Sequence, residues 1–138
     1  MAVRSETFDH DADVGVAGEG DTVEEAFAGA ARAMFSVIAD LDVVEPRQEV
    51  RFACDAPDLE LLLVRWLNVL LAEADLRGMV FCDFELEIDG ASLRGRALGE
   101  RLDPARHAPG VEVKGATLTA LEVEHGPAGW RAQTVVDV

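Results

Sequence analysis

Four side chains that bind cations or protons stand together in "FDHDADVG", residues 8–15. Asp9, Asp11 and Asp13 occupy every second position, and His10 lies between the first two. Because like charges this close repel one another, the stretch is either a solvated turn or a site that holds a cation. Hard divalent cations such as Ca²⁺ and Mg²⁺ prefer several oxygen ligands around one centre. Both interpretations are open at this point.

An EF-hand calcium loop is excluded by its spacing. That motif requires a glycine at position six for a sharp turn and a bidentate glutamate at position twelve. Counted from Asp9, those two positions hold Val14 and Gly20. Any further ligands for a metal ion must therefore come from elsewhere in the chain.

The end of the sequence offers a second group of oxygens. Asp137 carries a carboxylate, and Val138 carries the free main-chain carboxylate. If the first and last strands pair in one sheet, these oxygens can join those of residues 9–13 around one hard ion. Strand periodicity places the three aspartates on one side of the chain and His10 on the other. The pattern does not separate such a metal site from solvated aspartates, which are the commoner outcome.

Other catalytic arrangements lack their defining residues. The sequence has no G-x-S-x-G elbow, and "GVAGEG" has neither the lysine nor the spacing of a phosphate-binding loop. His10, His107 and His125 are too scattered to indicate a zinc site. Cys54 and Cys82 fall in apolar runs without C-x-x-C spacing, so we expect free, buried thiols in a reducing cytosol.

The charge balance argues against strong direct binding to nucleic acid. The 138 residues carry 27 Asp and Glu against 12 Lys and Arg, a formal net charge of −15. Affinity for nucleic acid comes largely from neutralised phosphates, which requires the opposite balance. The surplus suits a protein that meets cations or a basic partner surface, although an acidic proteome would also produce it. Eleven of the basic residues are arginine, so the single lysine, Lys114, stands out.

Composition and patterning predict a cytoplasmic protein without a membrane span. The N-terminus "MAVRSETFDH" has no apolar signal-peptide core. The longest apolar stretch, "LELLLVRWLNVLL", is interrupted by Glu60, Arg65 and Asn68 and is too short to cross a bilayer. With 49% hydrophobic and 28% charged residues, the chain fits one domain, residues 1–138, with its own core.

Two long helices are predicted between the candidate residues. Thr22 and Glu25 have the spacing of a capping box, which begins a helix at about residue 23. Asp58 begins a second helix that runs to about residue 74 and stops by Gly78. Apolar positions cover most of the circumference of the second helix and include Trp66, so we expect it to be the central buried helix.

The remaining segments read as strands joined by turns. We expect strands in residues 6–10, 13–20, 49–56, 79–90, 91–102, 113–125 and 129–138. Because turns and not crossover helices join the later strands, most pairs should be antiparallel. The predicted fold class is therefore α+β, a single domain of mostly antiparallel sheets with two main helices packed on them.

Five motifs together resemble the archease family. They are "DHDADVGVAGEGDTVEEAF", "DLELLLVRWLNVLL", "GERLDPARH", "EVKGATLTALEV" and "GWRAQTVVDV", in this order over nearly the whole chain. Each motif alone is weak, whereas the set is specific. The resemblance implies the archease fold and a small acidic protein that is not itself an enzyme. It would serve as accessory activator of the tRNA-splicing RNA ligase, which is also used in RNA repair.

The resemblance also implies how such a protein acts. The partner ligase joins a 2′,3′-cyclic phosphate or 3′-phosphate end to a 5′-hydroxyl end with GTP and divalent metal, and the family member promotes ligase guanylylation and multiple turnover. A divalent cation, seen as calcium in the family, would be held at Asp13, Asp137 and Val138, with magnesium or manganese as alternatives. Family members commonly carry threonine in place of Asp11, so this extra carboxylate adds a ligand, tunes affinity or faces water.

Lys114 matches a lysine that the family needs for activating the ligase. An ammonium group there suits a contact with the partner or with GTP phosphates, since it acts as a point charge. Asp9, His10 and Asp11 are further candidate contacts for the metal or the partner. Two other functions stay open: a stand-alone metal-dependent phosphoester hydrolase that uses residues 9–13, and a chaperone-like module for RNA-modifying enzymes in general.

Overall fold

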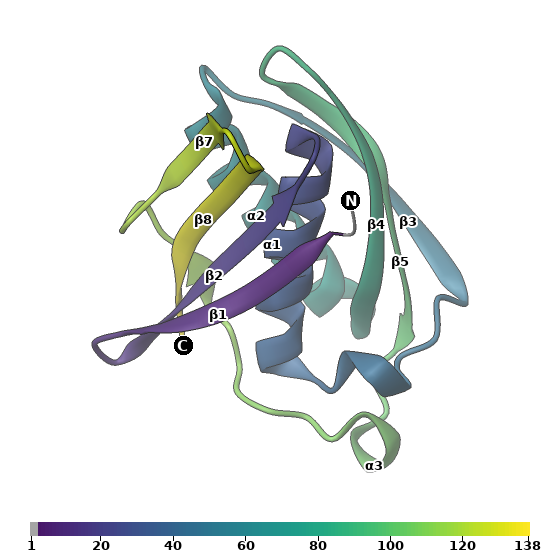
Figure 1. Cartoon of the computed structure of the whole chain (residues 1–138). Coiled ribbons are helices and arrows are strands. Elements are labelled where there is room, and N and C mark those ends of the chain that lie inside the picture. Colours follow the sequence, from purple (N-terminus) through teal and green to yellow (C-terminus); the bar gives the residue numbers. More distant parts are fainter. Residues whose placement is uncertain (1–2) are drawn as a thin grey trace.

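The computed structural model describes residues 3–138 (Figure 1). Its strands are β1 (Arg4–His10), β2 (Asp13–Gly20), β3 (Gln48–Asp55), β4 (Met79–Asp89), β5 (Ser92–Arg101), β6 (Gly115–Ala116), β7 (Glu122–Gly126) and β8 (Gly129–Asp137). Its helices are α1 (Val23–Ile38), α2 (Leu59–Arg77), the single turn α3 (Pro104–His107) and the 3₁₀ turn η1 (Leu41–Val43). Neither long helix combines the length and apolar character that a membrane span requires, and the same holds for the other described helices.

Two antiparallel sheets enclose the two long helices, which form the middle layer (Figure 1). The larger sheet has the strand order β1-β2-β8-β6, and β7 also pairs with β8. The smaller sheet has the order β3-β5-β4. All the pairings between the described strands are antiparallel. The predicted α+β class is confirmed, with the refinement that sheets cover the helices from both sides.

Local capping fixes where both long helices begin. The Thr22 hydroxyl accepts from the Glu25 N–H at 3.1 Å, and the Glu25 carboxylate accepts from the Thr22 N–H at 3.0 Å. Asp58 Oδ1 accepts from the Leu61 N–H at 2.8 Å. Gly78, with φ of 64°, ends α2 in the left-handed region that glycine favours. The predicted start of each helix is confirmed.

The helix α1, and not α2, is the more deeply buried of the two. Nine of the 16 residues of α1 are buried, compared with six of the 19 residues of α2. The larger sheet covers one side of α1 and β4 covers another, whereas Arg65 and Leu76 on α2 face solvent. The prediction that α2 is the central helix is therefore wrong. Its Trp66 is nonetheless fully buried, packed against the rings of Phe27, Phe52 and Phe84.

Two glycines let α1 lie directly against β2. A Cβ atom at Gly18 would stand 2.1 Å from the carbonyl oxygen of Ala26 and 2.2 Å from the nitrogen of Ala30. A Cβ atom at Gly29 would stand 2.5 Å from the carbonyl oxygen of Arg4 and 2.8 Å from the Gly18 Cα. Since a methyl group fits at neither position, the distance between helix and sheet depends on both glycines.

Replacing Gly18 by alanine should lower the free energy of unfolding by about 3 kcal/mol, because backbone atoms of α1 would have to move off the sheet. Urea denaturation measures this change. The control is Gly126→Ala, where an added Cβ meets nothing within 4 Å. If the free energies of unfolding of Gly18→Ala and Gly126→Ala lay within about 0.5 kcal/mol of each other, this would contradict the predicted close packing.

Candidate functional site

The β1–β2 hairpin rearranges the acidic cluster at residues 9–13. Asp11 and Ala12 form its two-residue turn, with Asp11 at φ of 53°, and His10 pairs with Asp13. Directly opposite residues on antiparallel strands point to the same face. His10 therefore shares a face with Asp13, while Asp9 lies on the other face. The prediction that the three aspartates share one face and His10 takes the other is wrong, because the chain turns between them.

The side chains at the turn stay close to water. The Asp11 carboxylate is 95% exposed and lies 3.9 Å from His10 Nδ1. Asp9 is also exposed, whereas Asp13 is half-buried. Of the three aspartates, Asp13 is thus the one that the fold partly shields.

Pairing of β2 with β8 brings the end of the chain beside Asp13. The ladder begins with Val14 opposite Val136, so Asp137 comes next to Asp13 in the register. The backbone N–H of Val138 donates to Asp13 Oδ1 at 3.3 Å. The predicted juxtaposition of Asp13, Asp137 and Val138 is confirmed, although the second strand and not the first makes the pairing.

The short strand β6 brings Lys114 to the same end of the larger sheet. The N–H of Lys114 donates to the carbonyl oxygen of Asp137 at 2.7 Å, and Gly115 pairs with Asp137. From the other side, the Asn68 side chain of α2 accepts from the Ala116 N–H at 2.9 Å and donates to its carbonyl at 3.2 Å. The Lys114 side chain is exposed and forms no ion pair within residues 3–138.

The chemistry of these groups fits a hard divalent cation. Asp13 and Asp137 present carboxylate oxygens, and neither forms an ion pair with a basic side chain in the described part of the chain. Across residues 3–138, no three side chains of His, Cys, Asp or Glu are grouped closely enough to hold a metal. A cation here would therefore need main-chain oxygens and water as its remaining ligands, and Val138 lies beside Asp13.

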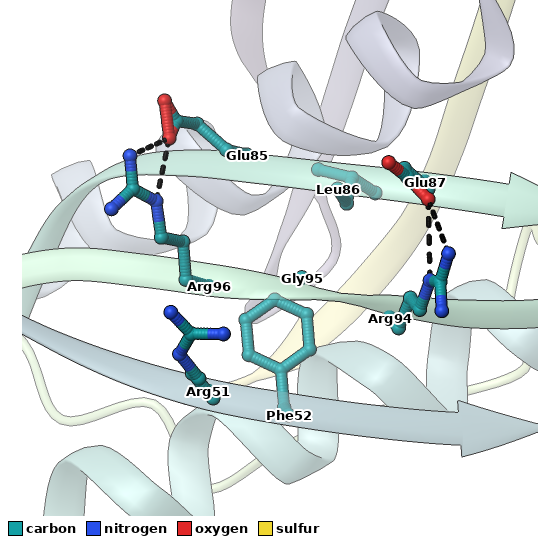
Figure 2. Close-up of a pocket in the computed structure, with 8 residues that line it drawn as sticks. All are labelled: Arg51, Phe52, Glu85, Leu86, Glu87, Arg94, Gly95 and Arg96. Carbon is teal, nitrogen blue, oxygen red and sulfur yellow. Dashed lines mark hydrogen bonds and ion pairs between the residues drawn. The ribbon is translucent and has the colours of Figure 1, made fainter.

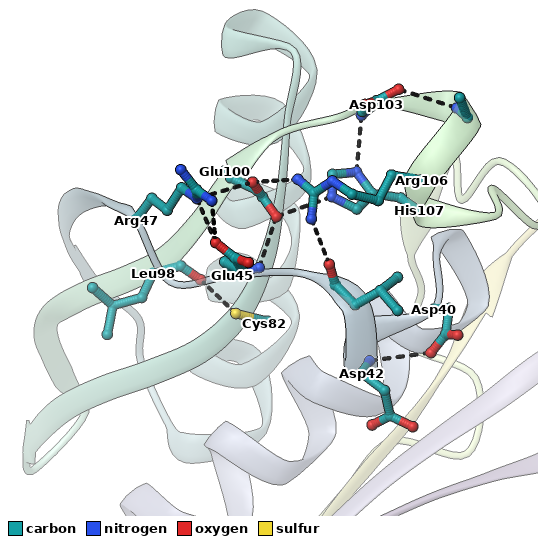
Figure 3. Close-up of polar contacts among 12 residues, drawn as sticks. Asp40, Asp42, Glu45, Arg47, Cys82, Leu98, Glu100, Asp103, Arg106 and His107 are labelled. Atoms are coloured by element: carbon teal, nitrogen blue, oxygen red, sulfur yellow. Dashed lines mark hydrogen bonds and ion pairs between the residues drawn. The ribbon is translucent and has the colours of Figure 1, made fainter.

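A buried ion cluster holds the loop that follows β5 (Figure 3). Glu100 accepts from Arg106 Nη2 at 2.6 Å and from the Glu45 N–H at 2.7 Å. The fully buried His107 accepts at Nδ1 from the Asp103 N–H at 2.8 Å. Its proton is therefore on Nε2, which lies 3.0 Å from Glu100 Oε2 and donates to it.

The charge of Glu100 is strongly favoured by these contacts. The Arg106 guanidinium, followed by a backbone N–H, lowers the pKa of Glu100 to about 2, even though burial acts in the opposite direction. Further along the loop, Gly110 and Val111 donate their N–H groups to the last carbonyls of α1 at 2.7 and 3.0 Å. The loop is thus attached at two places before it reaches Lys114.

The outer face of the smaller sheet carries a ladder of ion pairs (Figure 2). Arg96 bridges Glu49 at 2.6 Å and Glu85 at 2.5 Å, and Arg94 pairs with Glu87 at 3.0 Å. The hydrogen bond between Glu49 and Arg96 is the main cause of the lowered pKa of Glu49. Glu49, Glu85 and Glu87 each have an arginine partner across the strands, so these ion pairs support strand register.

Comparison with known proteins identifies the family. The model of the Archease protein family (MTH1598/TM1083) matches residues 6–138. The chain belongs to the archease family. It is 41% identical over 140 residues to the archease of Pyrococcus abyssi, covering 98% of this chain and 99% of that one. It is also 41% identical over 138 residues to the archease of Pyrococcus furiosus, covering 96% and 97% of the two chains.

Solved structures share the archease fold of this chain. The solution structure of protein 1598 from Methanobacterium thermoautotrophicum matches with a TM-score of 0.85 and 33% identity, over 97% of this chain and 98% of that one. The crystal structure of a Thermotoga maritima archease, described as a possible chaperone, matches with a TM-score of 0.63 and covers 96% of both chains. At 17% identity, the second likeness concerns the fold alone.

Two structural features of this archease were missed from the sequence. In the sequence, Asn68 only interrupts an apolar stretch, yet a lone amide in a half-buried helix indicates a backbone partner, here Ala116. Glu100, Arg106 and His107 all lie within the motif "GERLDPARH", whereas Glu45 joins them from a distant segment and has no comparable signal in the sequence.

Replacing Glu100 by glutamine should lower the melting temperature at about pH 7 by several degrees, since Arg106 and His107 lose an ionised partner. The folded-state pKa of about 2 lies below the ordinary value of 4.5. The carboxylate's contribution is therefore complete above pH 4.5 and is lost as the pH falls toward 2.

Thermal unfolding across this pH range measures the effect. The difference in melting temperature between the wild-type chain and Glu100→Gln should shrink with acidification, with the exposed Glu87→Gln as control. A difference that stays constant down to pH 2 would contradict the assigned role of Glu100.

Proposed function

We propose that this archease is an accessory activator of the GTP- and metal-dependent RNA ligase of tRNA splicing and RNA repair, and that it promotes ligase guanylylation and multiple turnover. The observation that carries the proposal is the convergence of Asp13, Asp137, Val138 and Lys114 at one end of the larger sheet. These are the residues that the family resemblance assigns to the metal and to the ligase. They come from three separate segments of the chain.

Each of these residues has a defined chemical task in the proposal. Asp13 and Asp137 supply carboxylate oxygens, and Val138 supplies main-chain oxygen, to a calcium, magnesium or manganese ion. When bound, the ion supplies positive charge to the surface that meets the GTP site of the ligase. Lys114 supplies a second positive charge that binds phosphate oxygens. His10 shares the face of Asp13 and is a further contact, whereas Asp9 on the opposite face is not.

The overall charge of the molecule supports a protein partner. A net charge of −15 repels the phosphates of RNA but steers the chain toward a basic protein surface. An enzyme that binds RNA carries such a surface, since it neutralises phosphates. The proposed partner is therefore the ligase protein and not its RNA substrate.

Substituting Asp13 or Asp137 by asparagine should weaken binding of Ca²⁺ or Mn²⁺ at least about tenfold, because each change removes a charged ligand. Isothermal titration calorimetry measures the dissociation constants. Asp9→Asn is the matched control, because it removes the same charge from the opposite face of β1. If both Asp13→Asn and Asp137→Asn bound the ion with the affinity of the wild-type chain, a metal site at these residues would be contradicted.

In a ligase guanylylation assay with labelled GTP, the wild-type chain should accelerate GMP transfer to the ligase. Asp13→Asn and Lys114→Met should reduce this stimulation about tenfold or more, since the first weakens binding of the metal ion and the second removes the cation that contacts phosphate. Asp9→Asn and Arg51→Met, an exposed cation on the smaller sheet, should leave it unchanged.

The assay also separates the competing functions. No stimulation by the wild-type chain would overturn the proposal. Unchanged stimulation by Asp13→Asn would keep the activator but exclude the metal site from its mechanism. Hydrolysis of a phosphoester by the chain alone, abolished in Asp13→Asn, would instead favour the stand-alone hydrolase.

A further inference from the structure

An apolar pocket of about 360 Å³ lies where the C-terminal ends of α1 and α2 meet the loop that leads to Lys114. Its apolar wall is built by Phe35, Ile38, Leu71, Met79, Leu102 and Val113. The volume is large enough to bury one leucine-sized or aromatic side chain. Nothing in the proposed metal site or in the Glu100 cluster uses this pocket.

The rim of the pocket is negatively charged. Asp75 and Glu112 belong to its lining, which contains no lysine or arginine. In the described part of the chain, neither carboxylate forms an ion pair, and the nearby Arg77 is already paired with Glu73 at 2.8 Å. The C-terminal ends of two long helices add the negative pole of their dipoles. The rim therefore complements a cation.

Exposed apolar side chains flank both carboxylates. Leu76, which follows Asp75 on α2, is 81% exposed, and Val111, which precedes Glu112 on the loop, is 54% exposed. Val111 belongs to the lining of the pocket, whereas Leu76 does not, and an exposed apolar side chain at the edge of an apolar pocket is typical of a contact surface. The loop side of the pocket thus offers apolar contact and negative charge together, at Val111 and Glu112.

We propose that this pocket docks an extended segment of the partner protein in which a large apolar side chain stands next to an arginine or lysine. The apolar side chain enters the pocket, and the cation pairs with Asp75 and Glu112. That the partner is the RNA ligase rests on the proposed function. Because the loop 109–113 continues directly into Lys114, docking here places the partner against the Lys114 end of the larger sheet.

Binding and activation then depend on different residues, and a titration of ligase guanylylation separates them. The double variant Asp75→Asn/Glu112→Gln removes the rim charges at constant size. It should raise the archease concentration for half-maximal stimulation about tenfold and weaken its salt dependence, with the maximal rate retained. The control Asp89→Asn/Glu124→Gln removes the same charge at exposed positions elsewhere and should shift that concentration less than about twofold.

A second variant tests the apolar part of the site. Ala74→Leu extends a lining side chain into the pocket and should also raise the half-maximal concentration about tenfold, because it occupies the space that the partner fills. Its melting temperature shows whether it folds. If it does not fold, the charge variants decide alone.

Equal half-maximal concentrations for the two double variants would overturn the docking proposal and leave the activator function intact. A lower maximal rate of Asp75→Asn/Glu112→Gln at an unchanged half-maximal concentration would overturn it as well.

If the wild-type chain neither binds nor stimulates the ligase, the proposed function fails. The dipeptides N-acetyl-Leu-Arg-amide and N-acetyl-Leu-Glu-amide then test the pocket itself. Backbone NMR shifts in residues 109–113 with the first dipeptide alone support it, and equal or absent shifts with both overturn it.

Discussion

The pairing of β2 with β8 is the constraint on which the rest of this archease depends. It joins two segments from opposite ends of the sequence in a single register, from Val14 opposite Val136 to Gly20 opposite Trp130. A slip of one residue would turn Val16 or Val136 away from the core cluster in which both are buried, so burial of these side chains fixes the register. The same register places Asp13 beside Val138, which means that the core and the candidate site are specified together.

Local signals in the sequence predicted what is determined locally. The caps at Thr22 and Asp58 act within one helical turn, and both helix starts follow from them. Strand periodicity gives the wrong face for Asp9, because the two-residue turn at residues 11–12 reverses the chain between Asp9 and Asp13. The greater burial of α1 likewise depends on which layers cover each helix, and helical periodicity carries no information on that. The juxtaposition of Asp13 with Asp137 was predicted only on the assumption that the chain ends pair.

Lys114 is an exposed side chain on an irregular segment, yet its backbone is held from several directions. Glu100 fixes the start of the loop, the last carbonyls of α1 hold its middle, and Asn68 with β8 fixes its end. Ordering a flexible loop at an interface costs affinity, and a loop already fixed in the free protein avoids that cost. This arrangement suits a lysine whose task is to meet a partner in one defined place.

Some acidic residues of this archease are paired with arginine, and others are not. On the sheet faces, several acidic residues are neutralised across strands, as in the contacts of Arg96 with Glu85 and of Arg131 with Glu6. Asp13, at the end of the larger sheet, and the carboxylates around the pocket have no such partner in residues 3–138. Asp13 is half-buried, so it gains more from an incoming cation than a fully solvated carboxylate does, because local screening is weaker. Cross-strand arginines thus hold part of the negative charge within the sheets, while Asp13 and the carboxylates of the pocket are left to interact with an incoming cation.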